Sequence, residues 1–376
     1  WYTVLLGAVI GGLLVYVQRR LMDETQEQLI PQIADKTDAV HDFAHRRPWI
    51  SAGLGIITIV GIVILSVGSW VWFAPLRTGA LTSSPEPIQD YTAALSAIDA
   101  IYAEELAEEL NPACGTKLLT HGGKTEKVIV FFHGFTNCPE QFVPFGEQFF
   151  EQGYNVFIPR MPHHGLADRL TIDLAQLTAE ELVRFGDDTV DIVQGLGEEI
   201  TVVGLSGGGN VAAWVAQHRP EVDRAVLIAP MLGVLMLPDY VIKPVINAAL
   251  TLPNLFMWWD PATRENVSGP DYAYPRYPTK ATGQLLRLGY EVQQVARDTA
   301  PATSRILAIS NEVDPAVNND VLEKLIDKWR ENGNIVETYR FPEDMGLPHD
   351  VIDPNQPEQQ VDMVYPILFD LIEGDS

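Results

Sequence analysis

A serine set among glycines at the end of an apolar run is the strongest chemical signal in the sequence. The motif GLSGG at 204–208 follows the β-branched run 200–205 and precedes an alanine- and valine-rich stretch at 210–218. A strand, a tight turn and a helix form the setting that an exposed nucleophilic serine requires. The glycines let strand and helix pass closely, and the helix N-terminus favours a developing anion. We therefore predict that Ser206 is a nucleophile; the alternative is a glycine-rich strand-to-helix turn without chemistry.

A serine nucleophile needs a base, and the base needs a carboxylate that orients it. With a strand-to-helix serine turn, the expected order along the chain is serine, acid, histidine. His349, in GLPHD, is the predicted base, because His218 closes the helix after the turn and points away from it. The segment ILAISNEVDPAV follows a strand-like run at 305–310 and supplies Asp314 as the predicted acid, with Glu312 as the alternative.

The negative oxygen formed by attack on a carbonyl needs two N–H donors. Gly207, directly after the serine, is one predicted donor. The other is the backbone N–H of Phe135, in the loop that continues the apolar run KVIVFF. His133 precedes the serine in the chain and lies in a His-Gly turn, so we expect it to brace this loop rather than act as the base.

Short apolar runs alternate with helical patterns through the second part of the chain, which is typical of a mostly parallel sheet covered on both faces. The predicted fold class is therefore α/β. The strand-like runs lie at 127–132, 155–159, 200–205, 224–229, 305–310 and 335–341, and the helical patterns at about 139–152, 178–195, 208–218, 316–331 and 358–373.

One long apolar, proline-broken interruption separates two of these runs, at about 231–298. It is far longer than a usual connection between strand and helix. We interpret it as a helical cap over the site; an insertion that only packs on the core is the alternative. Its apolar side chains are the predicted substrate pocket: Leu235, Leu237, Leu255, Phe256, Met257 and Trp258.

From about 112 to 373 the chain resembles the α/β-hydrolase family, and within it the monoacylglycerol lipase and carboxylesterase branch. The resemblance rests on HGFTNCPEQF at 133–142, MPHHG at 161–165, GLSGGG at 204–209, NEVDPAV at 311–317, and His349. Where that branch usually reads Pro-Gly-His-Gly, this chain has Pro-His-His-Gly. The resemblance implies ester hydrolysis through an acyl-serine intermediate, with no cofactor and no metal.

Two apolar segments precede this region. Residues 1–18 are predicted to form a transmembrane helix, or the end of a longer one because the sequence starts at Trp1 rather than methionine; a signal-peptide core is the alternative. Residues 48–76 hold no charged residue and would extend about 43 Å as a helix, enough to span a membrane. Trp49 at one end, and Trp70 and Trp72 near the other, are placed as interfacial aromatics are. A buried core helix is the alternative.

The basic residues predict the orientation. Five of them lie in 19–47, whereas after 76 there is only Arg77 before Lys117. The positive-inside rule therefore makes 19–47 a cytoplasmic loop and places the rest outside the cytoplasm. Residues 77–110 are predicted to be a linker and a leading helix, and 111–376 the α/β-hydrolase domain.

The composition excludes some partners. The formal net charge is −25, from 50 acidic and 25 basic residues, so no basic face for nucleic acid is expected. The two cysteines, Cys114 and Cys138, do not form a metal-ligand pattern. In an oxidising compartment they could form a disulfide that braces the loop after Phe135. Two unrelated thiols are the alternative.

The predicted function is a membrane-anchored serine hydrolase of carboxylic esters, with small-molecule or lipid esters as partners. A thioesterase, amidase or acyltransferase would use the same residues. A catalytically silent membrane-tethered binding module is the alternative from another class.

Overall fold

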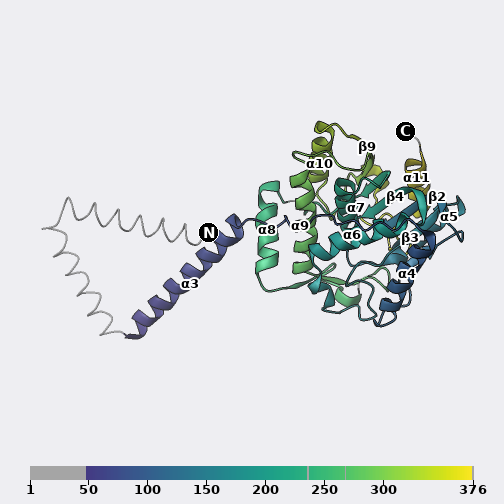
Figure 1. The fold of residues 1–376 in the computed structure, drawn as a ribbon. Coiled ribbons are helices and arrows are strands. Elements are labelled where there is room, and N and C mark those ends of the chain that lie inside the picture. Colours follow the sequence, from purple (N-terminus) through teal and green to yellow (C-terminus); the bar gives the residue numbers. More distant parts are fainter. Residues whose placement is uncertain (1–47, 235–236, 267, 375–376) are drawn as a thin grey trace. The chain divides into compact units, whose positions relative to one another are not determined.

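The computed structural model describes residues 48–234, 237–266 and 268–374. The chain divides into two compact units, residues 1–70 and 71–376. Figure 1 shows the elements of both. The first predicted membrane helix, 1–18, and the predicted cytoplasmic loop, 19–47, lie outside the described residues.

The helix α3 (Pro48–Phe73) accounts for the described part of the first unit and ends in the second. Its stretch Gly55–Phe73 has a mean hydropathy of 2.3, and none of it is buried. At 1.5 Å per residue these 19 residues extend about 28 Å, close to the thickness of a bilayer's hydrocarbon core. Within the described residues this is the one helix long and apolar enough to cross a membrane. Of the two predicted membrane helices, the described residues contain one, and it is a candidate membrane span.

A seven-stranded sheet forms the centre of the second unit. Its strand order is β1-β3-β2-β4-β5-β8-β9, and all pairs are parallel except the antiparallel pair β1–β3. The strands are β1 (Lys117–Leu119), β2 (Thr125–Phe132), β3 (Asn155–Ile158), β4 (Gly197–Leu205), β5 (Arg224–Ile228), β8 (Arg305–Asn311) and β9 (Ile335–Phe341). This is the predicted α/β-hydrolase architecture, with one short antiparallel strand that the sequence patterns did not indicate.

Helices cover both faces of the sheet, because its strands are apolar on both sides. Val128 and Val130 of β2 face a core shared with α6 (Ala179–Val193), α7 (Gly207–His218), α9 (Thr279–Val295) and α10 (Asn319–Glu331). Ile129 and Phe131, between them, face a second core shared with α5 (Val143–Glu151) and α11 (Val361–Glu373). The described residues also form four short 3₁₀ turns: η1 (Pro139–Phe142), η2 (Asp173–Gln176), η3 (Arg264–Asn266) and η4 (Glu343–Met345).

The insertion between β5 and β8 is only partly helical. It contains α8 (Asp239–Thr251) and a separate two-stranded sheet of β6 (Phe256–Trp258) and β7 (Arg276–Pro278). The helix α9, which also falls in the predicted cap range 231–298, instead packs into the main core through Leu285 and Leu288. The predicted cap range 231–298 therefore includes a helix of the main core.

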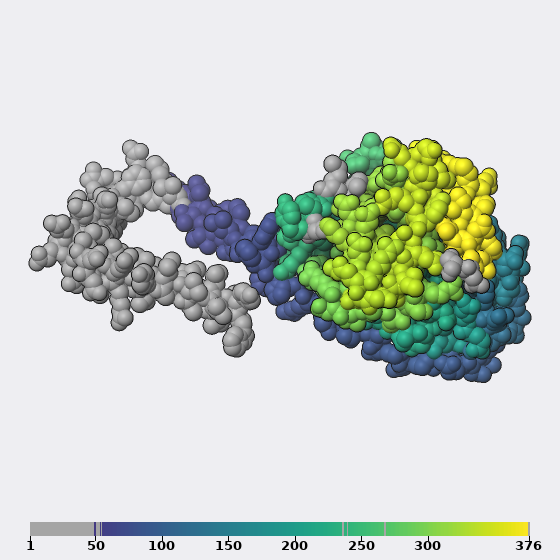
Figure 2. Space-filling model, turned by 90° about the horizontal axis from the view of Figure 1, so that it is seen from above, coloured from purple at the N-terminus to yellow at the C-terminus, as the bar shows by residue number. Residues whose placement is uncertain are grey.

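The segment between α3 and α4 (Tyr91–Glu105) is fastened to the hydrolase unit and is not a free linker. Leu81 is fully buried, and its carbonyl accepts a hydrogen bond from Trp214 Nε1 at 3.1 Å. The Asp187 carboxylate accepts from Ser83 Oγ at 2.5 Å and from Ser84 N–H at 2.8 Å. In Figure 2 the dark-blue start of the second unit runs along the surface of that unit.

Candidate active site

Ser206 lies at the sharp turn between β4 and α7, with backbone angles φ 54° and ψ −113°. Left-handed φ values are uncommon for a residue with a side chain and store strain. The turn is held from both sides, because Ser206 N–H donates to the Ile228 carbonyl and its own carbonyl accepts from Met231 N–H, both at 3.0 Å. The strained serine is thus fixed at the carboxyl end of the central strand, at the N-terminus of a buried helix.

The glycines around Ser206 are required by close backbone approaches. A Cβ at Gly208 would lie 2.1 Å from the Phe132 carbonyl oxygen, and one at Gly204 would lie 2.2 Å from the Gly208 carbonyl oxygen. Both distances are far below van der Waals contact. The glycines therefore let β2, β4 and α7 meet without side chains between them, as the sequence predicted.

Asp314 and His349 are brought together from two loops beyond strand ends. His349 Nδ1 donates to Asp314 Oδ2 at 2.7 Å, and the side chain of Asp314 is fully buried. The N–H groups of Ala316 and Val317 donate to Asp314 Oδ1 at 2.8 and 3.1 Å. Burial alone would raise the pKa of Asp314, but the hydrogen bond and charge of His349, with these two amides, lower it. An ionised Asp314 holds His349 so that Nε2 is left to accept a proton.

Ser206 and His349 line one cavity, whereas the alternative acid Glu312 accepts from Glu343 N–H instead of meeting the histidine. No hydrogen bond joins Ser206 to His349 in the part of the chain that the structure describes. In unliganded active sites such contacts are often long and tighten when a substrate binds.

The two predicted oxyanion donors are neighbours. A Cβ at Gly207 would lie 3.2 Å from the backbone nitrogen of Phe135, so the two residues are close neighbours in space. Phe135 lines the cavity together with Ser206. Gly207 opens α7, and the first N–H groups of a helix have no partner within it.

His133 braces the loop that carries Phe135. Its Nδ1 donates to the Gly134 carbonyl and its Nε2 accepts from Met161 N–H, each at 3.0 Å. Burial lowers the pKa of His133 to about 3, so the ring stays neutral. This agrees with the bracing role that the sequence predicted.

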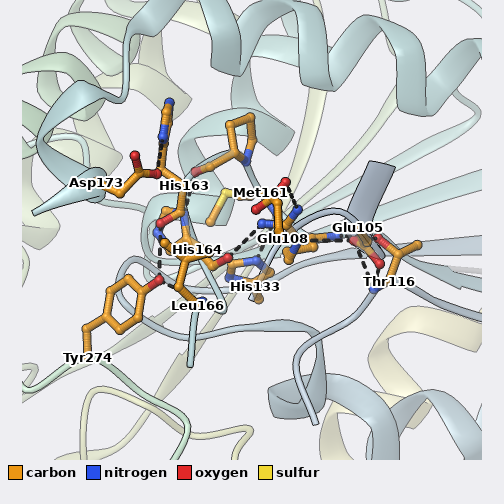
Figure 3. A network of polar contacts seen from close by, with 12 residues as sticks. Glu105, Glu108, Thr116, His133, Met161, His163, His164, Leu166, Asp173 and Tyr274 are labelled. Atoms are coloured by element: carbon orange, nitrogen blue, oxygen red, sulfur yellow. Dashed lines mark hydrogen bonds and ion pairs between the residues drawn. The ribbon is translucent and has the colours of Figure 1, made fainter. Parts of the chain in front are cut away.

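The Pro-His-His-Gly turn forms part of a polar network beside this loop (Figure 3). His163 has φ 66° and lies between Asp173, at 2.6 Å, and Glu181, at 3.3 Å. His164 is fully buried and donates from Nδ1 to the Pro162 carbonyl at 2.8 Å. The Tyr274 hydroxyl accepts from Leu166 N–H at 2.8 Å, which ties the turn to the insertion.

The cavity has a volume of about 620 Å³, and both apolar and polar residues line it. The apolar lining includes Met231, Val234, Val317, Trp259 and Tyr277; the polar lining includes Asn137, Gln141, Asp350 and Gln356. Asn137 and Gln141 belong to the motif HGFTNCPEQF and Asp350 to GLPHD, but the sequence assigned none of these side chains a place in a pocket.

The predicted pocket residues lie elsewhere. Leu237, Leu255, Phe256, Met257 and Trp258 are not among the residues that line the cavity, and Leu235 lies outside the described residues. The rings of Phe256 and Trp258 instead flank the Arg276 guanidinium, at 4.4 and 5.7 Å from their centroids. Trp259, one residue further, lines the cavity and donates from Nε1 to Thr136 Oγ1 at 2.9 Å.

Cys114 and Cys138 form the predicted disulfide, with 5.3 Å between their Cα atoms. Both cysteines are fully buried and pack with Tyr272. The bridge therefore fixes the chain three residues after Phe135. Among the described residues no three His, Cys, Asp or Glu side chains gather as metal ligands would.

Comparison with known proteins identifies the family. The model of the family described as serine aminopeptidase, S33, matches residues 123–339. The thermostable monoacylglycerol lipase of Bacillus sp. (strain H-257) is 26% identical over 200 residues, covering 52% of this chain and 74% of that protein. A structure of the metagenome-derived lipolytic enzymes LipS and LipT matches with a TM-score of 0.52 at 20% identity, covering 70% of this chain and 98% of that one. The monoacylglycerol lipase of Paleococcus ferrophilus matches with a TM-score of 0.51 at 15% identity, covering 68% and 97%. The chain therefore belongs to the serine aminopeptidase S33 family of α/β-hydrolases.

Proposed function

We propose that this serine hydrolase cleaves carboxylic esters of lipid-like alcohols or acids, with Ser206, His349 and Asp314 as its catalytic residues. The observation that carries the proposal is that a strained serine at a helix N-terminus and a histidine bound to a buried aspartate line one cavity.

In this mechanism Ser206 Oγ attacks the ester carbonyl while His349 Nε2 takes the hydroxyl proton. The carbonyl oxygen becomes negative and is stabilised by the N–H groups of Phe135 and Gly207. Collapse of the tetrahedral intermediate breaks the bond to the alcohol, which leaves with the proton from His349. Water then attacks the acyl-serine with the same proton transfers and releases the acid.

The apolar lining supports an ester with a hydrocarbon portion. Met231, Val234 and Val317 offer aliphatic contacts beside Ser206, and each methylene buried there could contribute up to about 0.8 kcal/mol. The related monoacylglycerol lipases make acylglycerols the first substrates to test.

The test is hydrolysis of p-nitrophenyl esters from acetate to long acyl chains by the purified protein, with Ser206→Ala as the matched variant. We expect catalytic efficiency to rise with acyl length until the cavity is filled, and Ser206→Ala to lose about 10³-fold or more. A fluorophosphonate probe should label the parent protein and not the variant. An unlabelled parent without activity on any ester would contradict the proposal.

Amide hydrolysis is a second candidate, because the family is described as serine aminopeptidase. It uses the same acyl-serine and differs in the leaving group, which must be protonated before it departs. Amino-acid p-nitroanilides in the same assay separate the two, since we expect turnover of esters without turnover of free-amine anilides.

We further propose that α3 anchors the enzyme in a membrane and that the hydrolase unit lies outside the cytoplasm. The exposed apolar stretch Gly55–Phe73 supports the anchor, and the Cys114–Cys138 disulfide supports an oxidising compartment. Protease treatment of intact cells or spheroplasts tests the side: the hydrolase unit should be digested without lysis, and full protection would contradict it.

A further inference from the structure

A glutamine side chain connects the two loops that the proposed reaction depends on. Gln141, in η1, is buried, and its Oε1 accepts from Gly134 N–H at 2.7 Å. Its Nε2 donates to Asp350 Oδ2, also at 2.7 Å. Asp350 directly follows His349, and Gly134 directly precedes Phe135. We propose that Gln141 is a positioning residue that keeps the Phe135 amide in register with His349; this rests on the proposed function.

The peptide group that carries the Phe135 N–H is held from the other side. The Gly134 carbonyl accepts from His133 Nδ1 at 3.0 Å and from Asn137 N–H at 3.1 Å. In a trans peptide the C=O and the following N–H point in opposite directions, so fixing the Gly134 carbonyl aims the Phe135 N–H. Gln141 fixes the remaining polar group of Gly134, its own N–H. With both groups held, the turn has one orientation.

Asp350, which accepts the hydrogen bond from Gln141, is itself held by several further hydrogen bonds. Asp350 Oδ2 also accepts from Gln356 Nε2 at 3.0 Å, and its Oδ1 accepts from the N–H groups of Ile352 and Asp353, each at 3.1 Å. The carboxylate is thus the centre of the loop that follows His349. Asn137 also joins the two loops, since its Nδ2 donates to Asp350 Oδ2 at 3.4 Å and to Asp353 Oδ2 at 3.3 Å. Gln141 makes the shorter bonds, so a shift of the loop after His349 would be transmitted to Gly134 chiefly through its side-chain amide.

Glutamine fits this position because the two partners demand opposite hydrogen-bonding groups. The Gly134 N–H requires an acceptor, whereas the Asp350 carboxylate requires a donor. A side-chain amide offers both at its two ends. Glutamate has the same shape but would place a carboxylate oxygen against Asp350, and methionine would leave the Gly134 N–H buried without a partner.

A second buried glutamine provides the matched control. Gln217, near the end of α7, accepts from Trp329 Nε1 at 2.7 Å and donates to the Ala300 carbonyl at 3.1 Å. It uses both ends of its amide as Gln141 does. It follows Ser206 by 11 positions, about 16 Å along the helix axis. Its substitution should weaken the fold without touching the proposed site.

The experiment compares Gln141→Glu and Gln141→Met with Gln217→Glu and Gln217→Met in the full chain. For the Gln141 variants we expect kcat to fall at least tenfold with KM within about threefold, because oxyanion stabilisation acts on the transition state. Affinity for a trifluoromethyl ketone, which forms an oxyanion on the serine, should fall by the same factor as kcat/KM. The Gln217 variants should lower the melting temperature and leave kcat unchanged.

Gln141 variants with kcat within twofold of the parent would overturn the inference, as would an equal loss of kcat in the Gln217 variants. If Gln141→Met does not fold, the isosteric Gln141→Glu decides alone. A parent protein that is neither active on esters nor labelled by a fluorophosphonate would refute the proposed function instead. The two failures are therefore distinguishable.

Discussion

At the scale of single residues, the backbone of α7 at Gly208 passes very close to the backbone at the end of β2, at Phe132. We predict that Gly208→Ala destabilises the protein by about 3 kcal/mol or more, because its Cβ would lie 2.1 Å from a backbone oxygen that cannot move without displacing β2. Gly79→Ala is the control, since nothing lies within 4 Å of a Cβ there. Urea unfolding of both variants measures the difference; equal midpoints would contradict the prediction.

We predict that the stability of the protein depends on pH through Asp353, whose N–H donates to the Asp350 carboxylate. Burial, and then the charge of Asp350, raise the pKa of Asp353 from 3.8 to about 6. The folded state therefore binds a proton more tightly than the unfolded state. The resulting stabilisation is fully present below pH 3.8 and is lost as the pH rises through about 6.

Asp353→Asn cannot titrate, so it isolates this effect. The free energy of unfolding of the parent minus that of the variant should decrease between pH 4 and pH 7, by at most about 3 kcal/mol. Any constant penalty from the amide facing the Tyr272 hydroxyl cancels in the trend. A difference that is flat or rises over this range would show that Asp353 is ionised throughout.

Local sequence signals were enough to place Ser206, Asp314 and His349 in one region, because each follows a recognisable strand. They were not enough to identify the residues that line the cavity. Trp258 and Trp259 are adjacent and chemically identical, yet only Trp259 lines the cavity, since β6 directs its neighbour toward Arg276. Gln141 and Asp350 are 209 positions apart, and only the folded chain shows that they meet.

At the scale of elements, the disulfide joins the segment before β1 to the start of η1. In the chain-entropy model, closing a loop with a sequence separation of 24 stabilises the fold by about 3 kcal/mol. We predict this loss for the Cys114→Ser/Cys138→Ser double variant in urea unfolding. Reduction of the parent protein should give a similar loss, and an unchanged midpoint in both cases would contradict the prediction.

The elements that could be predicted are those with a strong period or an unbroken apolar run. The six predicted strands correspond to β2, β3, β4, β5, β8 and β9. The first five are mostly buried, whereas the edge strand β9 buries only Val336 and Phe341. The three-residue strands β1, β6 and β7 are too short to show a pattern. The packing of α9 into the main core depends on tertiary contacts with α7, such as Asn210 Nδ2 donating to the Leu285 carbonyl at 2.9 Å.

At the scale of the whole molecule, the contacts of the segment 74–90 determine where a shortened but stable chain can begin. A chain that starts at Val71 keeps the buried Leu81 and the partners of Trp214 and Asp187; one that starts at Tyr91 loses them. We expect the shorter chain to be less stable by about 3 kcal/mol or more, from lost apolar burial and an unpaired indole N–H. Equal urea midpoints would show that residues 71–90 only rest on the surface.

The backbone of Ser206 has a consequence for the history of the molecule. A left-handed serine stores roughly 1–3 kcal/mol of strain, against a total folding stability of about 5–15 kcal/mol. Replacement by glycine would release part of that strain and, on the proposed mechanism, abolish turnover in the same step. In a lineage that no longer needs the reaction, loss of the nucleophile by this change would therefore carry no stability cost and would leave a larger margin for later destabilising mutations.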